Sequence, residues 1–133
     1  MFVRAIRRED GAIAVEFAVL LPLLVIILFA TIAFGTALSR LVSYVGAARE
    51  GARYAAVHCR PEALQCSQGL IQDRVAAAAA GNPIGGTVSV STDCSVTPGQ
   101  PVTVSWPQPI PIQVPFIPDM SVTVDVSASF RCE

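Results

Sequence analysis

Residues 11–39 read GAIAVEFAVLLPLLVIILFATIAFGTALS, and the 23 residues from Phe17 to Ser39 carry no charged side chain. A helix needs about 20 consecutive apolar residues to cross a bilayer, so this run is long enough. It is longer than the apolar core of roughly 7–15 residues that is typical of a removable secretory signal peptide. The sequence therefore predicts a transmembrane helix over residues 12–39.

The composition of the whole chain agrees with a membrane protein. Of its 133 residues, 53% are hydrophobic and 14% are charged, whereas soluble domains carry about 25% charged residues. Outside the membrane segment there is room for one small domain. The net charge of −1 gives no overall basic field that would attract nucleic acid, so no nucleic-acid partner is expected.

The orientation in the membrane has to be inferred from the flanks of the apolar run. Three arginines lie within residues 1–11 and three more within residues 40–53, so the positive-inside count is equal on the two sides. All four cysteines follow the apolar run, and an even number of cysteines in a small domain predicts disulfides and an oxidising compartment. We therefore expect a cytoplasmic leader over 1–11 and a domain outside the cytoplasmic membrane.

The start of the apolar run carries a carboxylate, Glu16, five residues after Gly11. A charge inside a membrane helix costs on the order of 2.5–3.5 kcal/mol at the bilayer centre, and less near the headgroups. In one interpretation Glu16 sits at the interface, where the positive end of the helix dipole favours it. In the other, a protease cuts after Gly11, and Glu16 pairs with the new Ala12 ammonium of a neighbouring copy, which sets the register between subunits.

A glycine followed by four residues, a glutamate and a long apolar helix resembles the prepilin signature of type IV pilin-like proteins. The longer string GAIAVEFAVLLPLLVIILF is similar to the start of the TadE-like family, the pseudopilins or minor pilins of the tight-adherence (Tad/Flp) pilus system. The stretch AAREGARYAA at 47–56 is similar to the helix that follows the membrane in this family. The ending SVTVDVSASFRCE is similar to the family's terminal strand.

The resemblance implies a structural minor pilin that takes part in assembly of a pilus for adhesion or secretion. Its partners would be the membrane, other pilins, the assembly platform and a prepilin peptidase that cuts after Gly11. Major pilins of this system are short and have tyrosine after the glutamate, whereas here Phe17 follows Glu16 and a domain follows the helix. The alternative is an uncleaved, single-pass membrane anchor that carries an extracytoplasmic binding module.

The membrane helix is expected to continue as a stem over residues 40–58. Apolar and mostly small residues recur there at helical spacing. They are Leu41, Val45, Ala48, Ala52 and Ala55. Small residues permit close helix approach, so this seam packs either against neighbouring stems or against the chain's own domain, and the sequence favours neither.

Residues 59–133 are predicted to form an α+β head of a short helix followed by a small antiparallel sheet. Pro61 is expected to open the helix, and Gly81-Asn82-Pro83 to end it after Ala80. Alternation with period two predicts three strands. Their ranges are Thr87–Ser91, Val102–Trp106 and Ser121–Phe130.

The stretch PQPIPIQVPFIPD at 107–119 has five prolines. They exclude a central strand and favour an extended or edge segment. Its alternating apolar residues are interpreted either as an exposed contact surface or, preferably, as a loop that covers the sheet.

Four cysteines allow three connectivities. Cys94 and Cys132 fall near predicted strand ends, which favours pairing them, and a local bridge between Cys59 and Cys66 across the helix break is feasible. The lone His58 beside Cys59 lacks the spacing of a metal site and is not expected to form a catalytic dyad. The sequence predicts no enzyme, no cofactor and no small-molecule substrate.

Overall fold

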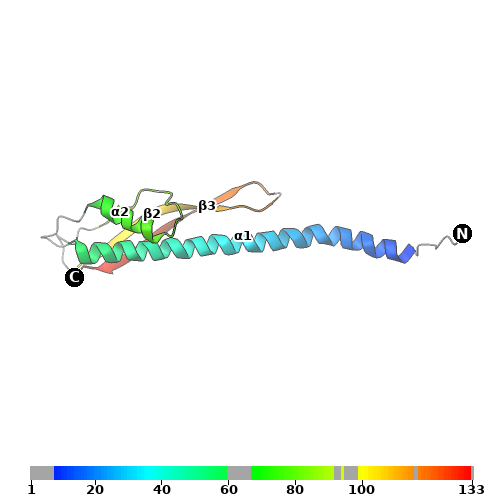
Figure 1. Cartoon of the computed structure of the whole chain (residues 1–133), viewed down its shortest axis with the longest axis horizontal. Helices are drawn as coiled ribbons and strands as arrows, with labels where there is room; N and C mark the ends of the chain where they lie inside the picture. The colour runs from blue at the N-terminus through cyan, green and yellow to red at the C-terminus, as the bar shows by residue number, and fades with distance from the viewer. Residues whose placement is uncertain (1–7, 60–66, 92–93, 95–98, 116, 133) are drawn as a thin grey trace.

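The computed structural model describes residues 8–59, 67–91, 94, 99–115 and 117–132. It is an α+β structure with a long helix, a short helix and a three-stranded antiparallel sheet, as the sequence predicts (Figure 1). The elements, in chain order, are α1 (Arg8–His58), α2 (Gln68–Ala78), β1 (Ser89–Val90), β2 (Pro101–Ile112) and β3 (Met120–Arg131).

Most of the first half of α1 stands clear of the rest of the molecule (Figure 1). The helix has 51 residues, which makes it about 75 Å long. It is long and apolar enough to cross a membrane, and its most apolar part has no buried residues. A helix that is apolar all round and is not covered by protein needs an apolar environment, so the chain has the membrane-spanning capacity that its sequence predicts.

The second half of α1 supports the head and ends at His58, where the sequence predicts the stem to end. Ala48, Ala52 and Ala55 are fully buried in the head core, and Leu41 and Val45 pack against its edge. The small-residue seam therefore contacts the chain's own head.

The short helix α2 begins later than predicted. Ser67 has an extended backbone, and its Oγ accepts a hydrogen bond from Leu70 N–H, so Ser67 is the N-cap and the helix starts at Gln68. The predicted opening residue, Pro61, lies outside the described residues. The helix ends at Ala78, two residues before the predicted end, and Ala80 and Gly81, which follow it, both adopt positive φ.

The contact between α2 and α1 depends on Gly51. Ile71 and Val75 of α2 are buried, and a Cβ added to Gly51 would overlap Val75 Cγ2. Glycine is the residue that lets two helices approach this closely.

The sheet places one face on α1 and the other in solvent. On β2 the even-numbered residues from Val102 to Ile110 are buried, and on β3 Val126 is buried. The outer face is polar, and two hydroxyl pairs bridge its strands: Thr103 with Ser129 at 2.7 Å, and Ser89 with Ser105 at 3.1 Å. The alternation that predicted the strands therefore corresponds to a half-buried sheet.

The preferred prediction for the proline-rich stretch is wrong, because its first half is strand rather than a covering loop. β2 extends to Ile112, and Pro107, Pro109 and Pro111 pair across the ladder with Asp125, Thr123 and Ser121 of β3. The prolines are expected to exclude a central strand, yet β2 is the middle strand of the sheet. The proline stretch itself lies on an edge, as expected, because β1 pairs with β2 only at residues 104–105.

Proline is tolerated here because all three prolines occupy odd positions. The carbonyl of Thr103 accepts from Ser91 N–H on the β1 side, so odd residues of β2 direct their backbone groups away from β3. The prolines thus remove N–H groups that would lie on the outer edge, and the bonds to β3 remain.

A glycine pair covers part of this edge. A Cβ on Gly85 would lie 2.7 Å from Pro109 Cγ, and one on Gly86 would lie 2.7 Å from the Pro107 carbonyl oxygen. The Gly85-Gly86 segment therefore packs its backbone directly on the prolines of β2 and shields the edge.

The buried polar residue Gln108 fastens this segment to the core. Its Oε1 accepts from Gly85 N–H at 2.9 Å and from Trp106 Nε1–H at 3.0 Å. Its Nε2 donates to the carbonyl of Pro83 at 3.3 Å and to that of Pro109 at 3.2 Å. The side chain is 2% exposed, so all of its hydrogen bonds are internal.

Replacing Gln108 with leucine is expected to lower the free energy of unfolding by about 1–3 kcal/mol, because buried donors would lose their acceptor. Urea unfolding of the full chain in detergent micelles, followed by the fluorescence of its single tryptophan, measures this. Gln72 is exposed on α2, and Gln72→Leu is the matched control. Equal stability of the two variants would contradict the role of Gln108.

Candidate functional site

Gly11 and Glu16 lie near the free end of α1, far from the head (Figure 1). Both are exposed, and a Cβ added to Gly11 would meet no atom within 4 Å. Together with Val15, Val19 and Leu20 they line a shallow groove on the helix surface. The two residues are therefore accessible from one side of the helix, in an otherwise apolar setting.

Glu16 has no partner for its charge among the described residues. The ion pair found in the described part of the chain joins Arg74 to Glu50 at 3.6 Å, beside the head. An unpaired carboxylate at the start of an apolar helix favours any positive group that can approach it. The arrangement suits binding of a cation or an ammonium group from outside the chain.

The Gly11–Ala12 peptide bond lies within helical backbone, since α1 begins at Arg8. Cleavage there would remove the first helical residues and make Ala12 the new first residue. Its ammonium group would then stand at the positive end of the helix dipole. Glu16 would follow four residues, or about one turn, further along.

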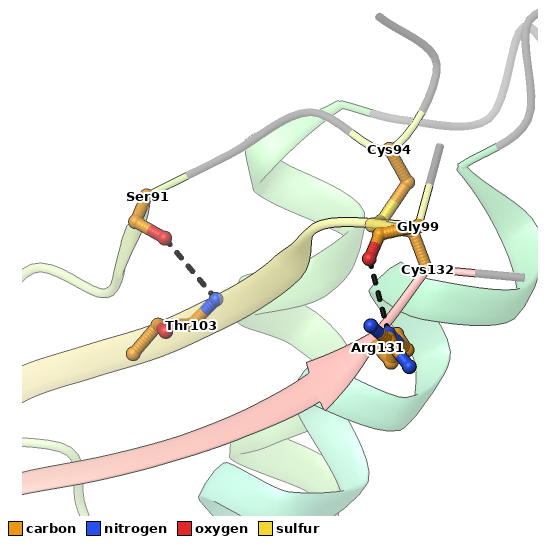
Figure 2. The surroundings of a disulfide bond; sticks show 6 residues. All are labelled: Ser91, Cys94, Gly99, Thr103, Arg131 and Cys132. Carbon is orange, nitrogen blue, oxygen red and sulfur yellow. Dashed lines mark hydrogen bonds between the residues drawn. A yellow bond between two sulfur atoms is a disulfide. The ribbon is translucent and has the colours of Figure 1, made fainter. Parts of the chain in front are cut away.

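The opposite end of the molecule is closed by disulfides. Cys94 and Cys132 are bonded, with their Cα atoms 5.4 Å apart, so this predicted pair is confirmed. Figure 2 shows the bridge at the end of β3, where Arg131 Nε donates to the Gly99 carbonyl at 3.1 Å. Cys59 is also disulfide-bonded, and Cys66, its expected partner, lies outside the described residues.

The surface beside the second helix carries a small aromatic and charged cluster. Tyr54 stacks on His58 with ring centroids 4.2 Å apart, and the Arg74 guanidinium lies 5.7 Å from the Tyr54 ring centroid. His58 Nδ1 is 3.2 Å from the Tyr54 carbonyl oxygen. Since Cys59 is in a disulfide, His58 has no adjacent free thiol to activate.

Sequence reasoning missed the importance of Gly51 and Gln108. The signal for Gly51 is a glycine in the middle of a small-residue seam, and the signal for Gln108 is an amide among prolines, where a buried position is least expected. Both position the head rather than the residues near Gly11.

Residues 11–53 match the model of a family described as TadE-like protein. The match begins at Gly11 and covers the apolar half of α1 and most of the stem, which confirms the resemblance found in the sequence. No curated protein and no solved structure matches the chain. The family match and the membrane-length helix fit a protein associated with the Tad pilus.

Proposed function

We propose that this protein is a minor pilin or pseudopilin of a Tad/Flp type IV-like pilus, processed by a prepilin peptidase after Gly11. The observation that supports the proposal is the position of the family match, which starts at Gly11. At that residue the charged N-terminal stretch gives way to the apolar helix, and Glu16 follows it. The role is structural, in assembly of an adhesive or secretory filament.

The proposed orientation puts residues 1–11 in the cytoplasm and the head outside the cytoplasmic membrane. Two disulfide-bonded sites, at Cys59 and at Cys94–Cys132, support it, because disulfides persist in oxidising compartments. The exposed apolar half of α1 then serves first as a membrane anchor and later as the segment that packs among other pilins.

In this proposal Glu16 provides the axial register between subunits. Before cleavage its charge has no described partner. After cleavage the Ala12 ammonium of an adjacent subunit neutralises it, and any other axial offset leaves both charges unpaired in an apolar bundle, which is penalised. Helix packing supplies the affinity between subunits, and the charge pair selects the offset.

The processing step is tested by the mass of the mature chain purified from its native cells. We expect a chain that starts at Ala12, and Gly11→Lys should leave the leader attached in essentially all molecules. Gly46→Lys is the matched control, because Gly46 is another exposed glycine of α1 with open space around it. A native chain that keeps its first eleven residues would support the uncleaved membrane-anchored binding module instead.

The register role predicts that Glu16→Gln lowers the amount of this subunit in sheared pili at least about tenfold, since 1.4 kcal/mol is sufficient for that factor. Membrane insertion and cleavage should persist, because the apolar run and Gly11 are unchanged. Immunoblots of pilus and membrane fractions measure both. Asp73→Asn, on the exposed surface of α2, should assemble normally, and normal incorporation of Glu16→Gln would contradict the role.

A further inference from the structure

The tip of the β2–β3 hairpin lies beside the apolar half of α1. The hairpin runs back along the helix toward its N-terminal end (Figure 1). A groove separates the two. It is lined by Phe29, Ile32, Ala33, Thr36 and Arg40 of α1 and by Pro111, Gln113 and Pro115 of the hairpin. Part of the head is therefore at the same level as the segment that has membrane-spanning capacity.

The level of this groove corresponds to the outer boundary of a membrane. A span of about 20 residues that begins at Ile13 ends near Ile32. Arg40 is eight residues further along, or about 12 Å, and helical side chains incline toward the N-terminus. Its guanidinium is thus directed toward the headgroup level, while Phe29 and Ile32 are at the level of the acyl chains.

The hairpin tip is apolar on its surface. Ile117, Met120 and Val122 are 43%, 58% and 47% exposed. Met120 and Val122 are on the same face of β3 as the buried Val126. An apolar surface of this kind, next to a membrane segment, is suited to burial in lipid.

The backbone of the tip is also suited to a low-water environment. An unsatisfied N–H group costs several kcal/mol in a bilayer, and Pro111, Pro115 and Pro118 carry none. Ile117 N–H donates to the Val114 carbonyl at 3.2 Å. The Thr36 hydroxyl of α1, which also lines the groove, donates to the Ala33 carbonyl at 2.8 Å.

We infer that the hairpin tip is a second membrane contact, which dips into the outer leaflet while a phospholipid occupies the groove. The acyl chain lies over Phe29 and Ile32, and the phosphate is near Arg40. Asp119 at the exposed turn limits the depth, because a carboxylate remains with the headgroups. This inference rests on the proposed membrane anchoring of α1, and it fixes the tilt of the head relative to the membrane surface.

The test uses the full chain in phosphatidylcholine vesicles whose acyl chains carry bromine, which quenches tryptophan on contact. Tryptophan is introduced at the tip by Ile117→Trp or, in a second variant, by Met120→Trp, both at exposed positions. The native Trp106 is 1% exposed in the head core and supplies a constant background. Leu24→Trp reports on the spanning helix. Ser127→Trp, on the outer face of β3, reports on the part of the head away from the hairpin tip.

We expect both tip variants to lose emission, more with bromine near the headgroups than with bromine near the chain ends, and Ser127→Trp to be unaffected. Quenching of Leu24→Trp without quenching of either tip variant would overturn this inference and leave the anchoring intact. Absence of quenching in Leu24→Trp would overturn the anchoring itself.

Discussion

Replacing Gly51 with leucine is expected to abolish the folded head while leaving the membrane helix in place. A Cβ at this position already overlaps Val75 Cγ2, and Val104 Cγ1 is 3.7 Å away. Both valines are fully buried, and a valine in a helix has one strongly preferred rotamer, so α2 would have to move away from α1. Overpacking by smaller groups costs about 1–3 kcal/mol, and the total stability of a domain is about 5–15 kcal/mol.

The fluorescence of Trp106 in detergent-solubilised full chain measures the outcome, because this single tryptophan is in the head core. Gly51→Leu should give an exposed, red-shifted emission without a cooperative urea transition. Gly51→Ala should lose up to about 2 kcal/mol, the overpacking cost of about 1–3 kcal/mol less the gain of about 1 kcal/mol in helix propensity. Gly46→Ala, with no atom near its added Cβ, should be neutral or stabilising, and equal stability of the two alanine variants would contradict the close helix contact.

Removing the Cys94–Cys132 bridge is expected to cost about 4 kcal/mol of stability, because the loop it closes spans a sequence separation of 38 residues. Both cysteines are 4% exposed, so the double variant Cys94→Ala and Cys132→Ala avoids burying new polar groups. The bridge ties the segment before β2 to the end of β3, where Cys132 N–H donates to the Gln100 carbonyl at 3.0 Å. We expect the end of the sheet to fray first when the bridge is absent.

Urea unfolding of the oxidised and the reduced chains separates this bridge from the one that includes Cys59. Reduction should destabilise the native protein by more than it destabilises the double variant, since the variant retains only the Cys59 disulfide. If reduction lowers the stability of both by the same amount, the Cys94–Cys132 bridge contributes nothing to the head. The emission of Trp106 again reports the transition.

The sequence predicts best those elements whose residue pattern is compatible with a single kind of structure. A charge-free run longer than a bilayer is thick predicts the exposed half of α1, and the periodicity of small residues predicts that the helix continues to His58. Cys94 and Cys132 pair because both predicted strand ends fall at one end of the sheet. The Gly11–Glu16 motif identifies the candidate site because a carboxylate is unusual at the start of such a run.

The features that the sequence does not predict depend on which partner a residue meets. The seam at Ala48, Ala52 and Ala55 would be the same for a neighbouring stem or for the chain's own head, because small residues permit either contact. The prolines of 107–111 favour a loop in the sequence, because the sequence does not reveal on which side of a strand each missing N–H group would lie. In the structure all of them lie on the side away from β3. β1 is shorter than predicted, and α2 begins at Gln68, directly after its N-cap Ser67.

The distribution of prolines along β2 has a consequence for how copies of the head behave when they are crowded. One margin of the sheet has lost its donors at Pro107, Pro109 and Pro111, and β1 adds only two residues there. In the described part of the chain no strand pairs with the other margin, along β3. Two heads that joined through their β3 strands would leave the proline edges of β2 on the outside, and these edges lack N–H donors for pairing with a further copy. Growth of a continuous sheet from copy to copy is therefore disfavoured along the proline stretch of β2.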